Sequence, residues 1–139
     1  MAGSTVVDFK LRSTELGSDV NIEDSDMEVQ DVPVERAGGP GSYVVISTAQ
    51  TTALQLSDLA PHIALAKMTW FYLKAEVGDI YIQLDTAGTT TFAAAAADIV
   101  VSAGDPALFI KLNPDGNLGV CIDGSAVTSA FTWYLEGKA

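Results

Sequence analysis

The feature that most constrains the fold is a succession of short apolar segments between residues 43 and 135. These segments are rich in β-branched and aromatic residues, and Gly, Pro, Asn and Asp separate them. Regular spacing of this kind is typical of an all-β sandwich or barrel. We expect strands at Tyr43–Thr48, Thr69–Ala75, Ile80–Leu84, Ile99–Ser102, Ala107–Leu112, Leu118–Ile122 and Phe131–Leu135.

Turn-forming residues predict how two of these strands are joined. Asn113-Pro114-Asp115-Gly116 has the residue types that a type I turn followed by a left-handed glycine favours. The segment therefore predicts a hairpin between Ala107–Leu112 and Leu118–Ile122. A different signal occurs near residue 95, where five consecutive alanines favour helix. That run is too short for a stable helix, so we expect a turn or a packed loop.

An acidic region precedes the strands. Eight of the 18 acidic residues lie between Glu15 and Glu35, and no Lys or Arg falls in this window. Low hydrophobicity with charge of one sign favours an extended arm, although apolar and polar residues alternate around Phe9 and Met27 as in half-buried strands. We interpret residues 1–36 as an extended acidic N-terminal arm whose strand segments dock on a sheet, including that of a neighbour. Its candidate partner-contact residues are Val7, Phe9, Leu11, Ile22, Met27, Val29 and Val32.

The body of the protein is expected at residues 37–139. It opens with Ala37-Gly38-Gly39-Pro40-Gly41-Ser42, the clearest linker of the chain, because Gly and Pro interrupt both helix and strand. A chain of 139 residues predicts one domain, large enough to bury roughly two thirds of its unfolded surface. We predict an all-β fold: a single antiparallel β-sandwich, with a jelly roll as the candidate arrangement.

Charge and composition exclude several classes of function. The net charge of −11 argues against binding nucleic acid, because neutralisation of phosphates by Lys and Arg supplies most of that affinity. Anionic membranes are disfavoured for the same reason, and no apolar run is long enough for a transmembrane helix. Residues 1–14 lack the features of a signal peptide, so we expect synthesis in the cytoplasm. Cys121 is the only cysteine, so the chain cannot form an internal disulfide. We expect its side chain to be buried and to pack as a small apolar residue.

No set of residues predicts catalysis. His62 is the only histidine, and a solvated or hydrogen-bonded loop residue is the expected role. A pair of carboxylates could hydrolyse glycosides, but with 12 Asp and six Glu in the chain a pair is expected by chance, so the signal is weak. Asp19, Asn21 and Glu23 are spaced like the first ligands of a calcium loop. Asp24 replaces the glycine that such a loop needs, however, and no Glu stands at the twelfth position. We predict no enzyme, no catalytic residue, no cofactor and no metal ligand, and leave open a weak cation site between subunits.

The aromatic run Trp70-Phe71-Tyr72 allows two interpretations. In a strand, Trp70 and Tyr72 lie on one face and Phe71 on the other, so at least one face packs in the core. Core packing is the interpretation we favour. Aromatic faces with a polar tip also make good platforms for sugars, and exposure of Trp70 and Tyr72 beside a further aromatic residue would favour a carbohydrate-binding surface.

The order of features from Val32 to the C-terminus resembles a family of small β-sandwich proteins of tailed-bacteriophage virions. The segments that carry the resemblance are Gly38–Thr48, Ala53–Leu59, Thr69–Ala75, Ile80–Asp85, Ala103–Leu112 and Phe131–Glu136. The resemblance implies a structural role, as a repeated accessory protein on the head, with no catalytic residues. The acidic arm and the alanine run depart from the family pattern. Packaged DNA would repel a charge of −11, which favours the outer surface of the capsid.

The resemblance, with which the charge and the lack of catalytic residues agree, implies a non-enzymatic virion structural protein, assembled in the host cytoplasm, that decorates or cements the capsid exterior. Its partners would be copies of itself and the major capsid protein or other virion proteins. A homotrimer is the favoured oligomer, because capsids offer threefold sites. The alternative is a carbohydrate- or receptor-binding β-sandwich module of a phage tail or cell surface.

Overall fold

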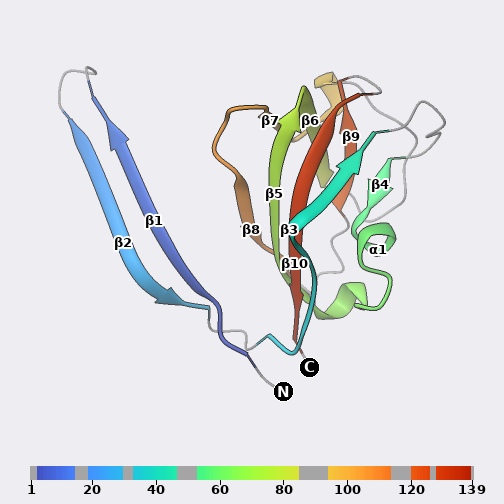
Figure 1. The fold of residues 1–139 in the computed structure, drawn as a ribbon, viewed down its shortest axis with the longest axis horizontal. Coiled ribbons are helices and arrows are strands. Elements are labelled where there is room, and N and C mark those ends of the chain that lie inside the picture. The colour runs from blue at the N-terminus through green and yellow to red at the C-terminus, as the bar shows by residue number, and fades with distance from the viewer. Residues whose placement is uncertain are drawn as a thin grey trace.

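The computed structural model describes residues 3–14, 19–29, 33–46, 53–84, 94–113, 120–125 and 128–138. Two strands near the N-terminus stand apart from a β-sandwich that contains the rest (Figure 1). The strands are β1 (Val6–Ser13), β2 (Val20–Glu28), β3 (Glu35–Val45), β4 (Leu54–Gln55), β5 (Met68–Val77), β6 (Asp79–Leu84), β7 (Ile99–Ser102), β8 (Leu108–Lys111), β9 (Val120–Gly124) and β10 (Ala130–Gly137). Short helices occur at α1 (Leu56–Leu59), η1 (Leu65–Lys67) and η2 (Ala94–Ala96).

The body consists of two four-stranded antiparallel sheets. One sheet has the strand order β3-β10-β5-β8, and the other has the order β4-β9-β6-β7. From β3 onward the chain changes sheet at every connection except that between β6 and β7. Eight strands divided in this way between two sheets form a jelly roll. The prediction of an all-β antiparallel sandwich is therefore confirmed.

The core lies between the two sheets because alternate residues of each strand point inward. In β5, Phe71, Leu73 and Ala75 are buried, whereas Trp70 and Tyr72 face outward and are half-buried. The remaining buried members of the core cluster are Ile46, Leu56, Ala60, Ile63, Met68, Ile80, Ile82, Val101, Leu112, Val120, Ile122, Phe131, Trp133 and Leu135. Each such large apolar side chain contributes roughly 1.5–3 kcal/mol by leaving water.

The predicted hairpin between residues 107–112 and 118–122 is wrong. Strand β8 pairs with β5 in one sheet, and β9 pairs with β4 and β6 in the other. A strong local turn signal does not determine which strand becomes the partner, because partner choice depends on which faces are buried together. The residues of the turn itself lie outside the described part of the chain.

The glycine-rich segment expected as a linker is part of strand β3. Thr132 pairs with Tyr43 and Tyr134 pairs with Gly38, so the intervening β3 residues bulge opposite Trp133 alone. Gly38 has a φ of 76°, and a Cβ there would lie 2.5 Å from the Trp133 carbonyl oxygen. Glycine is therefore required by both the backbone conformation and the close approach of Trp133. The turn expected in the alanine run is confirmed as η2.

Strands β1 and β2 form a separate two-stranded antiparallel sheet that projects from the end of the sandwich (Figure 1). The pairing shifts between Val7 and Phe9, where β2 holds one residue more than β1. Asp26 takes up this extra residue with a φ of 57°, and its backbone N–H donates to Asp8 Oδ1 at 2.8 Å. Aspartate tolerates this left-handed conformation better than most residues do. The alternating segments of the acidic region thus pair with each other in the same chain.

Candidate interaction surfaces: the hairpin and the outer sheet face

The hairpin has one apolar and one polar side. Cross-strand partners share a face, so the pairs Leu11–Ile22 and Phe9–Asp24 lie on the same side as Val20. Lys10, Glu23, Arg12 and Asn21 lie on the opposite side, where Lys10 Nζ is 3.8 Å from Glu23 Oε2. A two-stranded sheet with this pattern would normally bury its apolar side against another layer.

That apolar side is exposed in the single chain. Phe9 is 46% exposed and Ile22 is 48% exposed. Half of the large apolar side chains that the described residues expose lie on the hairpin: Phe9, Leu11, Val20, Ile22 and Met27 on this apolar side, and Val6, which pairs with Glu28, on the other side. Contiguous exposed apolar surface of this kind marks a site of interaction with another molecule.

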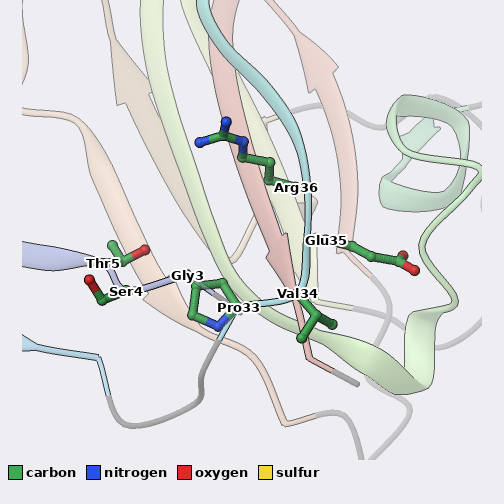
Figure 2. A pocket seen from close by; sticks show the side chains of 7 residues that line it. All are labelled: Gly3, Ser4, Thr5, Pro33, Val34, Glu35 and Arg36. Carbon is green, nitrogen blue, oxygen red and sulfur yellow. The ribbon is translucent and has the colours of Figure 1, made fainter. Parts of the chain in front are cut away.

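The base of the hairpin is joined to the body by hydrogen bonds. The Gly3 N–H donates to the Pro33 carbonyl at 2.9 Å, and the Val34 N–H donates to the Gly137 carbonyl at 2.9 Å. Figure 2 shows the hollow at this joint, about 290 Å³ in volume, with the Arg36 and Glu35 side chains pointing in opposite directions. These bonds fix the base of the hairpin, and the distal part diverges from the body (Figure 1).

A buried carboxylate, Glu136, completes this joint. Its Oε1 accepts hydrogen bonds from Thr5 Oγ1 and, at 2.6 Å, from Tyr134 Oη, while its Oε2 is buried and has no hydrogen-bond partner among the described residues. Burial, together with the hydrogen bond and negative charge of Glu136, raises the pKa of Tyr134 to about 12. Glu136 thus links the hairpin, through Thr5, to strand β10.

The outer face of the sheet β3-β10-β5-β8 is aromatic. Tyr72 is paired with Tyr134 on one side and with Phe109 on the other, so the three form a row across neighbouring strands. Trp70 stacks on Phe109 with ring centroids 4.7 Å apart, and Lys111 Nζ lies 5.9 Å from the Trp70 ring centroid. We call Trp70, Tyr72, Phe109 and Tyr134 the aromatic face.

Two concavities border the aromatic face. A groove of about 710 Å³ lies between this face and the base of the hairpin, which lines it with Val7, Phe9 and Met27. A smaller hollow of about 350 Å³ lies on the other side of Tyr72, where Gly39 and Thr132 line it with Tyr134. The bulge in β3 opens this second hollow, which we call the β3 hollow.

The predicted partner-contact residues separate into three groups. Val7, Phe9, Leu11, Ile22 and Met27 come together on the hairpin. Val29 is buried instead, and its N–H donates to the Thr5 carbonyl at 2.9 Å. Val32 lies outside the described residues.

The aromatic pair singled out in the sequence, Trp70 and Tyr72, does lie on an outer face. The sequence did not reveal Phe109 as a stacking partner of Trp70. The predicted hairpin paired Ala107–Leu112 with Leu118–Ile122, whereas β8 in fact pairs with β5. Sequence reasoning also missed Tyr134 as a neighbour of Tyr72, although the alternation of β10 puts Tyr134 on the face opposite the core residues Trp133 and Leu135.

The structure also places the residues that the sequence analysis considered for catalysis or metal binding. His62 is exposed, and its Nε2 lies 3.3 Å from the Arg36 carbonyl, as expected for a hydrogen-bonded loop residue. Cys121 is buried in β9, as expected. Asn21 and Glu23 belong to strand β2 rather than to a calcium-binding loop. Among the described residues, no three His, Cys, Asp or Glu side chains are grouped to hold a metal ion.

Comparison with protein-family models, curated proteins and solved structures found no match to this chain. In the part of the chain that the structure describes, no helix is long and apolar enough to cross a membrane.

Proposed function

We propose that this chain is a non-enzymatic structural protein of a tailed-bacteriophage virion that decorates or cements the capsid exterior through protein–protein contacts. The observation that carries the proposal is the projecting hairpin with its exposed apolar side. A protein that acts as a monomeric enzyme has no need for such a surface, whereas a cementing protein needs one that reaches beyond its own body.

Two further features support this proposal. The jelly roll is a common architecture of viral capsid domains, although it also occurs in lectins, so the fold alone does not select the function. The net charge of −11 favours a position away from packaged DNA and hence on the outer surface. In this proposal the hairpin bridges to the major capsid protein or to a neighbouring copy, and copies assemble as a trimer at capsid threefold sites.

Deletion of residues 1–29 tests the role of the hairpin. The body retains both of its sheets, so the truncated protein should keep a cooperative unfolding transition and the near-ultraviolet circular dichroism of the full chain. Full-length protein should co-sediment with capsids that lack it, and the truncated protein should remain in the supernatant. Equal co-sedimentation of the two proteins would contradict a bridging role.

The aromatic face favours a second candidate function, carbohydrate binding at a tail or cell surface. Trp70, Tyr72, Phe109 and Tyr134 form a half-buried aromatic cluster on an outer face, next to a groove of ligand size. Glycan-array binding that Trp70→Ala and Phe109→Ala abolish would support this candidate over the first. Binding to capsids with no glycan binding would support the structural role.

A further inference from the structure

The distal half of the hairpin's apolar side faces no surface of its own body among the concavities described above. Val7, Phe9 and Met27 at its base line the groove against the aromatic face. Leu11, Val20 and Ile22 lie further along the hairpin, are exposed, and line none of the concavities described above. Because the hairpin diverges from the sandwich (Figure 1), its distal half lies apart from its own sheet.

A surface of matching character exists on every copy of the chain. Beside the β3 hollow, Tyr43 is 52% exposed and pairs with Thr132, so it extends the outer face of the sheet beyond the row of Tyr72 and Tyr134. Val45 follows two residues later on the same strand and is 53% exposed. This end of the outer face is separated by Tyr72 from the groove that the chain's own hairpin borders.

The two surfaces are also complementary in charge. Residues 3–29 contain seven acidic and two basic residues, a net charge of −5. Of the five basic residues outside this segment, Arg36, Lys74 and Lys111 belong to the outer face, since they pair in register with Glu136, Thr132 and Trp70. Of the acidic residues there, Glu136 is buried, and Glu76, whose Oε1 lies 3.9 Å from Lys74 Nζ, offsets one of these three positive charges, so the face keeps an excess of basic side chains. Opposite charges on the two surfaces favour their association and orient it.

We propose that the distal half of the hairpin of one copy docks onto the outer sheet face of a second copy. Leu11, Val20 and Ile22 pack over the β3 hollow against Tyr43 and Tyr72, and Asp24, on the same side of the hairpin, meets Lys74. The contact joins two different surfaces, so it is heterologous and repeats from copy to copy, and we propose that three copies close it into a ring. This docking rests on the proposed function, from which we take the expectation that copies assemble. It deepens that function by identifying a second copy of the chain as the partner of the hairpin.

The sharpest test uses two variants that each destroy one side of the contact. Ile22→Asp places a carboxylate on the apolar side of the hairpin, and Tyr43→Asp places one on the outer sheet face. Both side chains are exposed, so neither change disturbs the core, and a retained cooperative unfolding transition verifies this. The matched controls are Asn21→Asp, on the polar side of the same strand, and Val100→Asp, on an exposed position of β7 in the other sheet.

Native mass spectrometry and sedimentation velocity of the full chain provide the readout. The unaltered protein should sediment as a closed oligomer, with three copies the size expected at a threefold site. Ile22→Asp and Tyr43→Asp should each raise the dissociation constant at least about tenfold, because each would bury an unpaired charge at the contact. Asn21→Asp and Val100→Asp should leave the oligomer unchanged.

Mixing the two disrupted variants identifies the geometry. The intact hairpin of Tyr43→Asp can dock on the intact face of Ile22→Asp, and neither variant can extend the chain further, so a 1:1 complex should form. Self-association of Tyr43→Asp alone would overturn the proposal in favour of hairpin–hairpin packing. A monomer at every concentration would also overturn it. A monomer that still co-sediments with capsids would leave the proposed function standing and assign the hairpin to a virion protein instead.

Discussion

A methyl group added at Gly38 tests whether the bulge of β3 is as tightly packed as the structure indicates. The residue has a φ of 76°, which costs an alanine about 1–2 kcal/mol. The added Cβ would lie 2.5 Å from the Trp133 carbonyl oxygen and 2.9 Å from Cε3 of the same residue. Because the closest atom belongs to the backbone, β3 or β10 must shift, and overpacking of this kind costs about 1–3 kcal/mol.

Gly41→Ala is the matched control within the same bulge. Gly41 has a φ of 86°, but no atom lies within 4 Å of the position that a Cβ would occupy. Gly41→Ala therefore carries the conformational cost alone, partly offset by the reduced entropy of the unfolded chain. We expect Gly38→Ala to be less stable than Gly41→Ala by about 2 kcal/mol.

Equilibrium urea unfolding, followed by tryptophan fluorescence at a single protein concentration, measures this difference. With an m-value of about 2 kcal/mol/M, the two midpoints should differ by about 1 M urea. A fixed concentration is needed because association of copies would itself add stability. Equal midpoints for the two variants would refute the close approach of Gly38 to Trp133.

Three further predictions concern the core and the joint of the hairpin. Phe71→Ala, at a fully buried site, should lower the free energy of unfolding by about 3–5 kcal/mol in the same urea titration. Phe9→Ala, on the exposed hairpin, should change the free energy of unfolding of the isolated chain by less than about 1 kcal/mol. Thr5→Val removes a donor to Glu136 and should speed amide hydrogen exchange in β1 and β2 but not in β5, whereas Ser4→Val should change neither. Because the pKa of Tyr134 is raised from 10.0 to about 12 in the folded protein, its contribution to stability is complete below pH 10 and is lost between pH 10 and about 12. Absorbance titration should show one late-ionising tyrosine that disappears in Tyr134→Phe and shifts toward pH 10 in Glu136→Gln; an unshifted titration in Glu136→Gln would contradict the role of the carboxylate.

Much of the fold could be predicted from local sequence patterns. The alternation in Trp70-Phe71-Tyr72 assigned Phe71 and its neighbours to opposite faces, and burial confirms that assignment. The strand segments around Phe9 and Met27 were also recognisable, because alternation of apolar and polar residues is a property of a few adjacent positions.

The components of the candidate site were visible in the sequence, but their arrangement was not. Phe109 lies beside Trp70 and Tyr72 only because β8 pairs with β5, a contact between residues that are 35 to 41 positions apart in the sequence. The turn at Asn113–Gly116 favoured a different neighbour for the same segment. Glu136, a charged residue near the end of the chain, carried no sequence signal for burial, and only the joint of Thr5 with β10 explains it.

The sequence by itself determined that this chain forms β-strands and which residues of a strand share a face, since that property depends on residues two positions apart. Tertiary structure decided which strands became neighbours, because pairing is selected by the burial of whole faces against each other. It also decided that Gly38 belongs to a strand and that the acidic region forms a hairpin with an uncovered apolar side. The surfaces available to a partner are consequences of that arrangement.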